Sequence, residues 1–471
     1  MTALERWTPV SPVPDPADVL LGLAVLEERG RDLAPCYLGA DLAWHGEAPR
    51  PITLVGAVPD ALLPAFPRGE PTSAFPWEPG VTRQVEGLQR FVDQIQRPDT
   101  DHAPGGLPFG GGVTVGWLGH ELAASRLVRY RSVLVHDPAG GAAWWVTPRG
   151  ERPVAGLRLV REAERLGRMA RAGLARAAGR AARGPGPPAW VPVGEIPYAE
   201  LVRRVKCEIA AGNVYQVNLS HEMRVRVGDG GPVALATTFL DLLARNPVRF
   251  PAFVGVGDTT VLAFSPERYV ARRGRRVESC PIKGTRPRAR QPEEDRRLAR
   301  ELLASPKDLA ENVMIVDLVR NDLGRVAAVG GVSVPGLCEI QSLASVHHLV
   351  STVQAQLRRG VRFGDIVAAV HPAGSMTGAP KVRAVDILTR LEARERGAYA
   401  GGVGWFAGDT CFDLAMVIRS LVVRDGEARL PVGGGIVADS DPVAEYRETL
   451  DKARSLVSVG AAAAAVPGER P

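Results

Sequence analysis

Short apolar runs broken by glycine and proline recur along the whole chain and limit its fold more than any other feature. The 471 residues include 52 glycines and 39 prolines, spread without the three-residue period of collagen. Residues 51–58 and 131–138 are typical of strands, whereas 198–212, 308–324 and 381–394 are typical of helices. Strands and helices follow one another without a regular βαβ order, which predicts an α+β fold.

The composition of the chain changes near residue 195 and predicts a division into segments. Residues 1–148 are rich in proline, glycine and short strand patterns, and we expect a β-rich N-terminal domain there. Residues 149–194 form a basic helix and linker, and residues 195–460 form the domain that carries the chemistry. Alanine-rich residues 461–471 are expected to be a flexible tail.

Positive charge is concentrated in one segment. The net charge is +6, and residues 149–183 contain ten arginines against three glutamates, so the rest of the chain is nearly neutral. A basic segment can bind nucleic acid, but this one has almost no aromatic residues that could stack on bases. The pattern favours a surface helix that runs into a linker, without a nucleic-acid partner.

Membrane and disulfide-stabilised proteins do not match this sequence. No run of eighteen apolar residues occurs, and the N-terminus lacks a basic start followed by an apolar stretch. The five cysteines are scattered and form no CxxC pair. We therefore expect a cytoplasmic protein with reduced thiols rather than disulfides or a zinc site.

Two pairs of carboxylates are spaced for one face of a helix. Asp308 and Glu311 are three residues apart, as are Glu445 and Glu448, and such pairs share a helical face. If the two helices faced each other, they would form an oxygen-lined site suited to Mg²⁺. From the spacing alone, two solvated helix surfaces are the more common interpretation.

Lysine is rare in this chain, which draws attention to its positions. Only five of the 58 basic residues are lysine, and Lys283 lies among glycine and proline, which predicts a fixed loop. A buried lysine there could be a nucleophile, or it could simply pair with an acid. Glu267 follows an apolar strand at a turn and is either a protonated general acid or the partner of Arg268.

Small residues mark two places where a backbone could approach an anion. Ser375 and Thr377 lie in a small-residue segment that leads into a helix, whose first amides can bind anions or can simply be capped. Gly433, Gly434 and Gly435 predict a turn with close backbone approach to a ligand.

Nine segments in order resemble the family of chorismate-utilising enzymes. They are QVNLS, SPER, PIKGTRPR, AENVMIVDLVRNDLGRV, HHLVS, SMTGAPKVRAV, IRSLVV, GGGIVADSDP and AEYRETLDKA, between about residues 195 and 460, with a weaker match in PFGGGVTVGWLGHEL. The family includes anthranilate synthases, aminodeoxychorismate synthases, and isochorismate and salicylate synthases. The resemblance implies a large two-layered β-sandwich flanked by helices, as in anthranilate synthase component I.

Within the family, a few positions resemble the aminodeoxychorismate synthase branch. PIKGT has Lys283 where anthranilate synthases usually have alanine, and Gln216 stands where isochorismate and salicylate synthases carry a water-activating lysine. The resemblance implies component I of aminodeoxychorismate synthase, which converts chorismate and ammonia to 4-amino-4-deoxychorismate for 4-aminobenzoate and folate synthesis. The alternative is component I of anthranilate synthase, which makes anthranilate and pyruvate.

The same resemblance implies a role for each site residue. Glu311 and Glu448 would bind Mg²⁺, with Asp308 and Glu445 in support, while Lys283 adds to C2 of chorismate and Glu267 protonates the departing C4 hydroxyl. The expected substrate-binding residues are Gly284, Thr285, His348, Thr377, Tyr399, Arg419, Gly433, Gly434, Gly435 and Lys452.

Ammonia needs a source, and the chain has no cysteine of the GxCxG kind that a glutaminase would use. The resemblance therefore implies a separate glutamine amidotransferase subunit. Two positions depart from the family: His120 stands where relatives often have tyrosine, and the LLES-like motif of the tryptophan feedback site is not visible. A non-catalytic scaffold is the remaining alternative, and the complete set of Glu267, Lys283, Glu311 and Glu448 argues against it.

Overall fold

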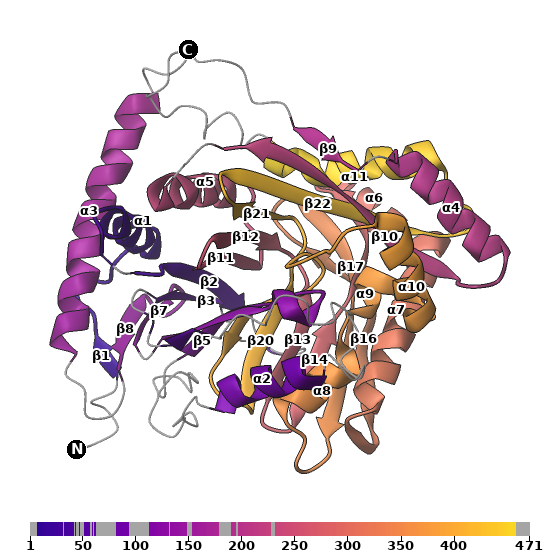
Figure 1. Ribbon diagram of the computed structural model, residues 1–471, viewed down its shortest axis with the longest axis horizontal. Helices are drawn as coiled ribbons and strands as arrows, with labels where there is room; N and C mark the ends of the chain where they lie inside the picture. The colour runs from indigo at the N-terminus through magenta and orange to yellow at the C-terminus, as the bar shows by residue number, and fades with distance from the viewer. Residues whose placement is uncertain are drawn as a thin grey trace.

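A computed structural model describes residues 7–457, except for 32, 42, 44–46, 48–50, 57–58, 60, 63–81, 94–112, 131, 148–152, 179–189, 195 and 228–230. Two large antiparallel sheets lie against each other with helices outside them (Figure 1). The predicted α+β class and two-layered sandwich are therefore confirmed.

The first sheet has twelve strands and combines N-terminal and C-terminal segments. In spatial order its strands are β1 (Trp7–Pro9), β8 (Ala142–Val146), β7 (Val133–Asp137), β3 (Pro51–Gly56), β2 (Cys36–Asp41), β11 (Phe250–Val256), β12 (Thr259–Ser265), β21 (Ser420–Arg424), β22 (Glu427–Ile436), β10 (Gln216–Arg226) and β18 (Gly378–Ala379), with β9 (Val191–Val193) also paired to β10.

The second sheet has ten strands. Its order is β15 (Ile282–Pro287), β17 (Val346–Leu357), β14 (Arg276–Cys280), β13 (Arg268–Arg273), β20 (Cys411–Met416), β19 (Gly402–Phe406), β5 (Val113–Leu118), β6 (Arg126–Tyr130) and β4 (Ala61–Leu62), with β16 (Ala327–Ser342) also paired to β17.

The helices cover the outer faces of the two sheets. They are α1 (Pro16–Glu28), α2 (Thr82–Asp93), α3 (Val154–Ala178), α4 (Tyr198–Ala210), α5 (Pro232–Arg245), α6 (Pro292–Leu303), α7 (Pro306–Gly324), α8 (Phe363–Val370), α9 (Gly374–Thr377), α10 (Lys381–Glu392) and α11 (Pro442–Val457). The helices predicted from residues 198–212, 308–324 and 381–394 are confirmed as α4, α7 and α10.

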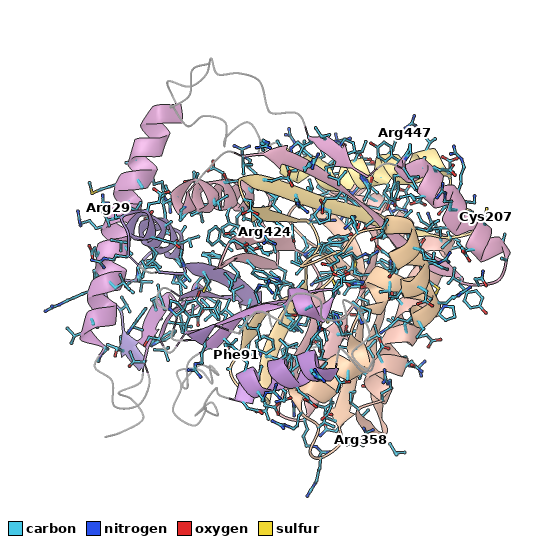
Figure 2. All side chains as sticks on the ribbon, in the orientation of Figure 1. Arg29, Phe91, Cys207, Arg358, Arg424 and Arg447 are labelled. Atoms are coloured by element: carbon cyan, nitrogen blue, oxygen red, sulfur yellow. The ribbon has the colours of Figure 1, made fainter. Side chains whose placement is uncertain are left out.

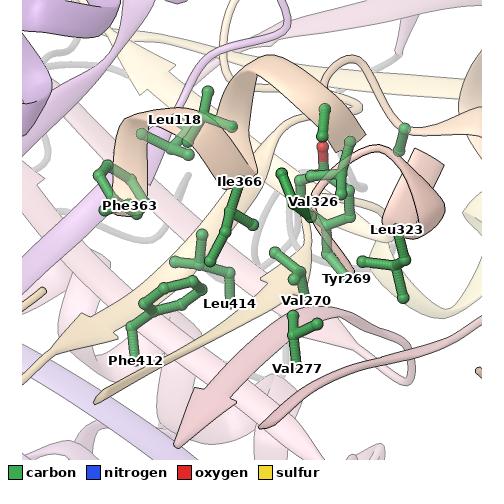
Figure 3. Packing of buried hydrophobic residues seen from close by; sticks show 14 of the residues in the cluster. Leu118, Tyr269, Val270, Val277, Leu323, Val326, Phe363, Ile366, Phe412 and Leu414 are labelled. Carbon is green, nitrogen blue, oxygen red and sulfur yellow. The ribbon is translucent and has the colours of Figure 1, made fainter. Parts of the chain in front are cut away.

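Apolar side chains fill the space between the sheets and the space beneath the helices. One core contains Trp117, Tyr130, Phe250 and Trp405, which come from strands of both sheets. A second core packs α2, α7 and α8 against the second sheet, and Figure 3 shows its packing around Phe363, Phe412 and Leu414. Strands β5, β19 and β20 are buried at every residue, so the second sheet is covered on both faces there.

Strands from both sides of residue 148 share each sheet. In the first sheet β2 pairs with β11, and in the second sheet β5 pairs with β19. The described part of the N-terminal segment therefore adds to the same two layers as the rest of the chain. The division at 148 and 195 stays a prediction, and the tail at 461–471 lies outside the described residues.

The basic segment forms helix α3, as predicted, and one of its faces is buried against α1. A Cβ on Gly22 would lie 1.7 Å from the carbonyl oxygen of Ala163, and one on Gly167 would lie 1.8 Å from that of Asp18. Only glycine permits this close approach of the two helices. Arg158, Arg165, Arg168 and Arg171 lie on the exposed side of this helix.

The five cysteines are free thiols, in agreement with the expectation of no disulfide. Cys207 is exposed on α4. Figure 2 shows it at the edge of the molecule, and it shows Arg29, Arg358 and Arg447 at other places along that edge. Among the described helices, none is both long and apolar enough to cross a membrane.

Candidate active site

Several of the predicted site residues lie close together where one end of β22 in the first sheet meets β15 in the second. The contact is direct, because a Cβ on Gly435 of β22 would lie 3.7 Å from Nζ of Lys283 in β15. Helices α7 and α11 bring carboxylates to the same region. Segments more than 150 residues apart in the sequence thus form one site.

Lys283 lies in an irregular strand rather than in the loop that the flanking glycine and proline predicted. The pairing of β15 with β17 shifts register between Ile282 and Thr285, which leaves Lys283 and Gly284 in a bulge. Gly284 has φ +82°, and a Cβ there would lie 2.8 Å from Leu302. The bulge turns the lysine out of the regular ladder and toward Gly435.

Burial lowers the pKa of Lys283, because removal of water disfavours the ammonium form. The nearby carboxylates of Glu311 and Glu267 oppose this shift, and Lys452 adds to it. No described carboxylate forms an ion pair with Lys283 within 4.0 Å. A buried amine with a lowered pKa is more readily neutral, and a neutral amine can act as a nucleophile.

Glu267 lies at the turn between β12 and β13, as predicted, and is 5% exposed. Burial raises its pKa to about 7, although Lys283, the Ser375 hydroxyl, the Ile282 amide and Arg419 each oppose the shift. The Ser375 Oγ donates to Oε1 of Glu267 at 3.1 Å. This carboxyl group can hold a proton near neutral pH, as a general acid requires.

Arg268 is not the partner of Glu267. Its guanidinium donates to Asp413 at 2.9 Å and to Glu278 at 2.8 Å, inside the second sheet. This excludes the alternative in which Glu267 merely neutralises its neighbour in the sequence.

A buried cation and a neutral imidazole lie beside Glu267 and Lys283. Arg419 has φ +49°, and burial lowers the pKa of its guanidinium while the charge of Glu267 opposes the shift. His348 is 1% exposed, and burial, together with Arg419, lowers its pKa to about 4. Its Nδ1 lies 2.9 Å from Thr285 Oγ1, and its Nε2 has no partner among the described residues.

The three glycines lie inside strand β22 and do not form the predicted turn. A Cβ on Gly433 would lie 2.4 Å from the Leu219 carbonyl oxygen, and one on Gly435 would lie 2.1 Å from Nε2 of Gln216. Gly434 faces Oε2 of Glu445 and Nζ of Lys452. A Cβ at Gly433 or Gly435 would overlap with neighbouring groups, so only glycine fits at these two positions. The backbone of this segment can therefore lie close to a ligand in the site.

Lys452 and Glu448 lie one helical turn apart on α11 and form an ion pair of 2.9 Å. Burial alone would raise the pKa of Glu448, but the charge and hydrogen bond of Lys452 lower it overall. The same Nζ donates to the Gly433 carbonyl oxygen at 3.0 Å. Lys452 therefore links α11 to the glycine segment.

Glu311 of α7 lies near Glu448. Burial raises its pKa, Lys283 and Lys307 oppose this, and the charges of Asp308 and Glu448 add to it. Two carboxylates from different helices therefore lie near each other, which the three-residue spacing alone did not predict.

The two supporting carboxylates have other partners. Asp308 accepts from Arg286 at 3.0 Å, and Glu445, which is buried, accepts from the Ser440 hydroxyl at 2.7 Å. Among the described residues, no three histidine, cysteine or carboxylate side chains form a cluster that could hold a metal by themselves. Glu311 and Glu448 still fit Mg²⁺, because this ion commonly takes one or two protein carboxylates and fills its remaining positions with water and substrate.

Two predicted substrate-binding residues have buried side chains with specific neighbours. Thr377 is the last residue of the short helix α9, separate from α10, and its hydroxyl donates to the Ala373 carbonyl oxygen at 3.0 Å. Tyr399 is 3% exposed near the guanidinium of Arg396, and burial raises its pKa to about 12. Neither hydroxyl can become charged near neutral pH.

Two buried amides add acceptors that the sequence did not assign to the site. Gln216 Oε1 and Asn218 Oδ1 have no partner among the described residues, while Asn218 Nδ2 donates to the Ser375 carbonyl oxygen at 3.1 Å. The strand pattern placed both residues on β10, but their neighbours come from distant segments. The positions of Gln216 and Asn218 in the sequence do not show that these amides lie near Glu267 and Lys283.

Comparison with known proteins identifies the family of this chain. Residues 83–458 match the chorismate binding enzyme family. Aminodeoxychorismate synthase component 1 of Klebsiella aerogenes is 42% identical over 261 residues, which are 55% of this chain and 57% of that protein. Anthranilate synthase component 1 of Streptomyces coelicolor is also 42% identical, over 56% of this chain and 51% of that protein.

Solved structures extend the similarity over nearly the whole fold. Anthranilate synthase component I of Streptococcus pneumoniae has a TM-score of 0.67 and 25% identity, and covers 88% of this chain and 94% of its own. The menaquinone-specific isochorismate synthase of Escherichia coli has a TM-score of 0.67 at 18% identity, which supports the fold alone. The matched region spans about half the length of the curated relatives. The chain belongs to the chorismate binding enzyme family.

Proposed function

We propose that the chain is component I of aminodeoxychorismate synthase, which adds ammonia to C4 of chorismate and retains the enolpyruvyl group. The observation that carries the proposal is the position of Lys283. Its amine lies beside the glycine segment, near the general-acid candidate Glu267 and the carboxylate Glu311. A structural lysine would instead be expected to form a close ion pair.

The first step is the attack of neutral Lys283 on C2. A C2–N bond forms, both ring double bonds shift by one position, and the C4–O bond breaks. Glu267 gives its proton to the departing hydroxyl, which leaves as water. Burial favours both starting states, because it lowers the pKa of the amine and raises that of the acid.

In the second step ammonia adds to C4 and the C2–N bond to Lys283 breaks. The proton that the new C4–N group loses returns to the Glu267 carboxylate, and the neutral lysine is restored. The general acid and the nucleophile therefore both end the cycle as they began it.

Chorismate is a dianion, and the site offers complementary charge. The Arg419 guanidinium has no ion-pair partner within 4.0 Å among the described residues, and Lys452 lies at the glycine segment. We assign these two residues, with the backbone of Gly433, Gly434 and Gly435, to the substrate carboxylates. Gly284, Thr285 and His348 would contact the ring, with Thr377 and Tyr399 in the wall.

Glu311 and Glu448 would hold Mg²⁺, with Glu445 and Asp308 nearby. Bound there, the ion would neutralise a substrate carboxylate. Nζ of Lys307 lies 4.0 Å from Glu311, and Nζ of Lys452 lies 2.9 Å from Glu448. These two lysines partly neutralise the charge of the two carboxylates.

Ammonia would come from a glutamine amidotransferase subunit. Several relatives are named as component 1, which implies a second component in those enzymes. We propose the same arrangement here, with folate synthesis as the use of the product.

An anthranilate synthase is the second candidate, because relatives of that name are equally similar. It would add ammonia to C2 and release pyruvate. Lys283 favours the first candidate, since a direct attack on C2 needs no amine at that position.

The test is to detect the covalent intermediate. Wild type, Lys283→Ala and Lys283→Arg are incubated with chorismate and Mg²⁺ without ammonia, digested, and analysed by mass spectrometry. We expect the wild-type peptide containing Lys283 to gain the mass of chorismate less one water. Alanine has no amine, and arginine stays protonated, so neither variant should form the adduct. A wild-type enzyme that aminates chorismate at C4 but never carries the adduct would overturn the assigned role of Lys283.

A further inference from the structure

A small buried cavity lies beside Glu267, between strand β13 and the helices α7 and α9. Its lining includes Glu267, Tyr269, Ser279, Asp322 and Ala373. Its volume of about 20 Å³ is enough for one water-sized molecule and far too small for a ring compound. The cavity therefore accepts only a small molecule next to the general-acid candidate.

The walls combine apolar and polar groups. Val319, Val370 and Met416 supply the apolar part. A neutral small molecule with hydrogen-bond donors suits such a site, whereas a charged one would lose its hydration there. Ammonia has the size of water, three N–H donors and one lone pair, while ammonium has no lone pair for attack.

The two carboxyl groups occupy different parts of this lining. Burial raises the pKa of both groups. Lys283, Ser375 and Arg419 oppose the shift at Glu267, whereas Lys381 and Arg325 oppose it at Asp322.

Asp322 lines the cavity as one member of a mostly buried ion pair. Lys381 donates to Asp322 at 2.5 Å and to the Val370 carbonyl oxygen at 3.3 Å. The side chains of Asp322 and Lys381 are each 10% exposed. The cavity therefore lies between the buried general acid and an ion pair that is largely shielded from solvent.

We propose that this cavity is the binding site for ammonia before it adds to C4. The inference rests on the proposed function. Glu267 becomes a carboxylate when the C4 hydroxyl leaves as water, and it then faces the cavity as a proton acceptor. Ammonia bound there forms the C4–N bond, the C2–N bond to Lys283 breaks, and the proton returns to Glu267. No other reactant is needed.

The experiment fills the cavity without touching a catalytic residue. Ala373→Val adds two carbon atoms to a side chain that lines it, and Ala369→Val makes the same change at a buried alanine outside it. For each variant the KM for ammonia, the KM for chorismate and the formation of the Lys283 adduct without ammonia are measured.

We expect Ala373→Val to raise the KM for ammonia about tenfold or more, because a methylene-sized change in a tight site has effects of that order. Its KM for chorismate and its adduct formation should stay at wild-type values, and Ala369→Val should match wild type in all three measurements. If Ala373→Val does not fold, Val319→Met fills the same cavity from α7 and should give the same result.

An unchanged KM for ammonia in a folded cavity-filling variant would overturn the inference, as would an equal rise in Ala369→Val. These outcomes are distinct from failure of the proposed function. In that case the wild-type enzyme itself would give no product aminated at C4.

Discussion

At the scale of single residues, the chemistry depends on where burial places an amine and an acid. Lys283 and Glu267 are sixteen positions apart, and nothing in that spacing brings them together. The sequence could predict their roles only through the nine family segments. Their geometry results from a bulge in β15 and from the turn before β13, both of which depend on pairing with distant strands.

The raised pKa of Glu267 predicts a loss of activity at high pH. The protonated form is the active acid, so kcat should fall as the pH rises above the pKa of Glu267, which is about 7. Initial rates are measured at saturating chorismate with the concentration of free ammonia held constant. Glu267→Gln should lower kcat about 10²- to 10⁴-fold and abolish this limb of the pH profile.

Glu222→Gln is the matched control, because Glu222 is also buried but lies on β10 with Arg394 and Arg429 nearby. It should retain the wild-type pH profile. If the high-pH limb persisted in Glu267→Gln, another group would control it.

At the scale of elements, the strand β22 and the helices α7 and α11 form the site. The sequence predicted the helix α7, and it predicted that each of the two carboxylate pairs would share a helix face. It could not predict that Asp308 pairs with Arg286, because that partner comes from another element. It also misread Gly433–Gly435 as a turn, because the glycines are required by close neighbours and not by a chain reversal.

Gly435→Ala tests the close approach of the two sheets. The added Cβ would lie 2.1 Å from Nε2 of Gln216 and 3.7 Å from Nζ of Lys283, so Gln216 must move into the site. We expect loss of most activity in a protein that still folds, measured by steady-state kinetics and circular dichroism. Gly173→Ala on helix α3 meets nothing within 4 Å and should leave activity unchanged. Wild-type kinetics for Gly435→Ala would contradict this description of the site.

Glu448→Ala tests the metal assignment on α11. We expect turnover to be abolished and the free energy of unfolding to change by less than about 0.5 kcal/mol, because the side chain is half exposed. Asp451→Ala on the same helix removes an exposed carboxylate that pairs with Arg454 and should keep full activity. Activity that survives in Glu448→Ala, or in wild type treated with a chelator, would exclude the Mg²⁺ role.

At the scale of the whole molecule, the sequence predicted the class and the two layers but not their composition. Residue 148 was predicted as a boundary because the basic segment begins after it. Yet the strands before it complete both sheets, since β2 and β5 need β11 and β19 as partners. Such pairing joins segments more than 200 residues apart, which no local pattern reveals.

The identity of the product tests the central claim most directly. The wild-type chain, without any partner subunit, is incubated with chorismate, Mg²⁺ and an ammonium salt at a pH where free ammonia is abundant. The products are identified by mass and by anthranilate fluorescence. We predict 4-amino-4-deoxychorismate, which retains the enolpyruvyl group, and no release of pyruvate. Direct formation of anthranilate and pyruvate would contradict the account.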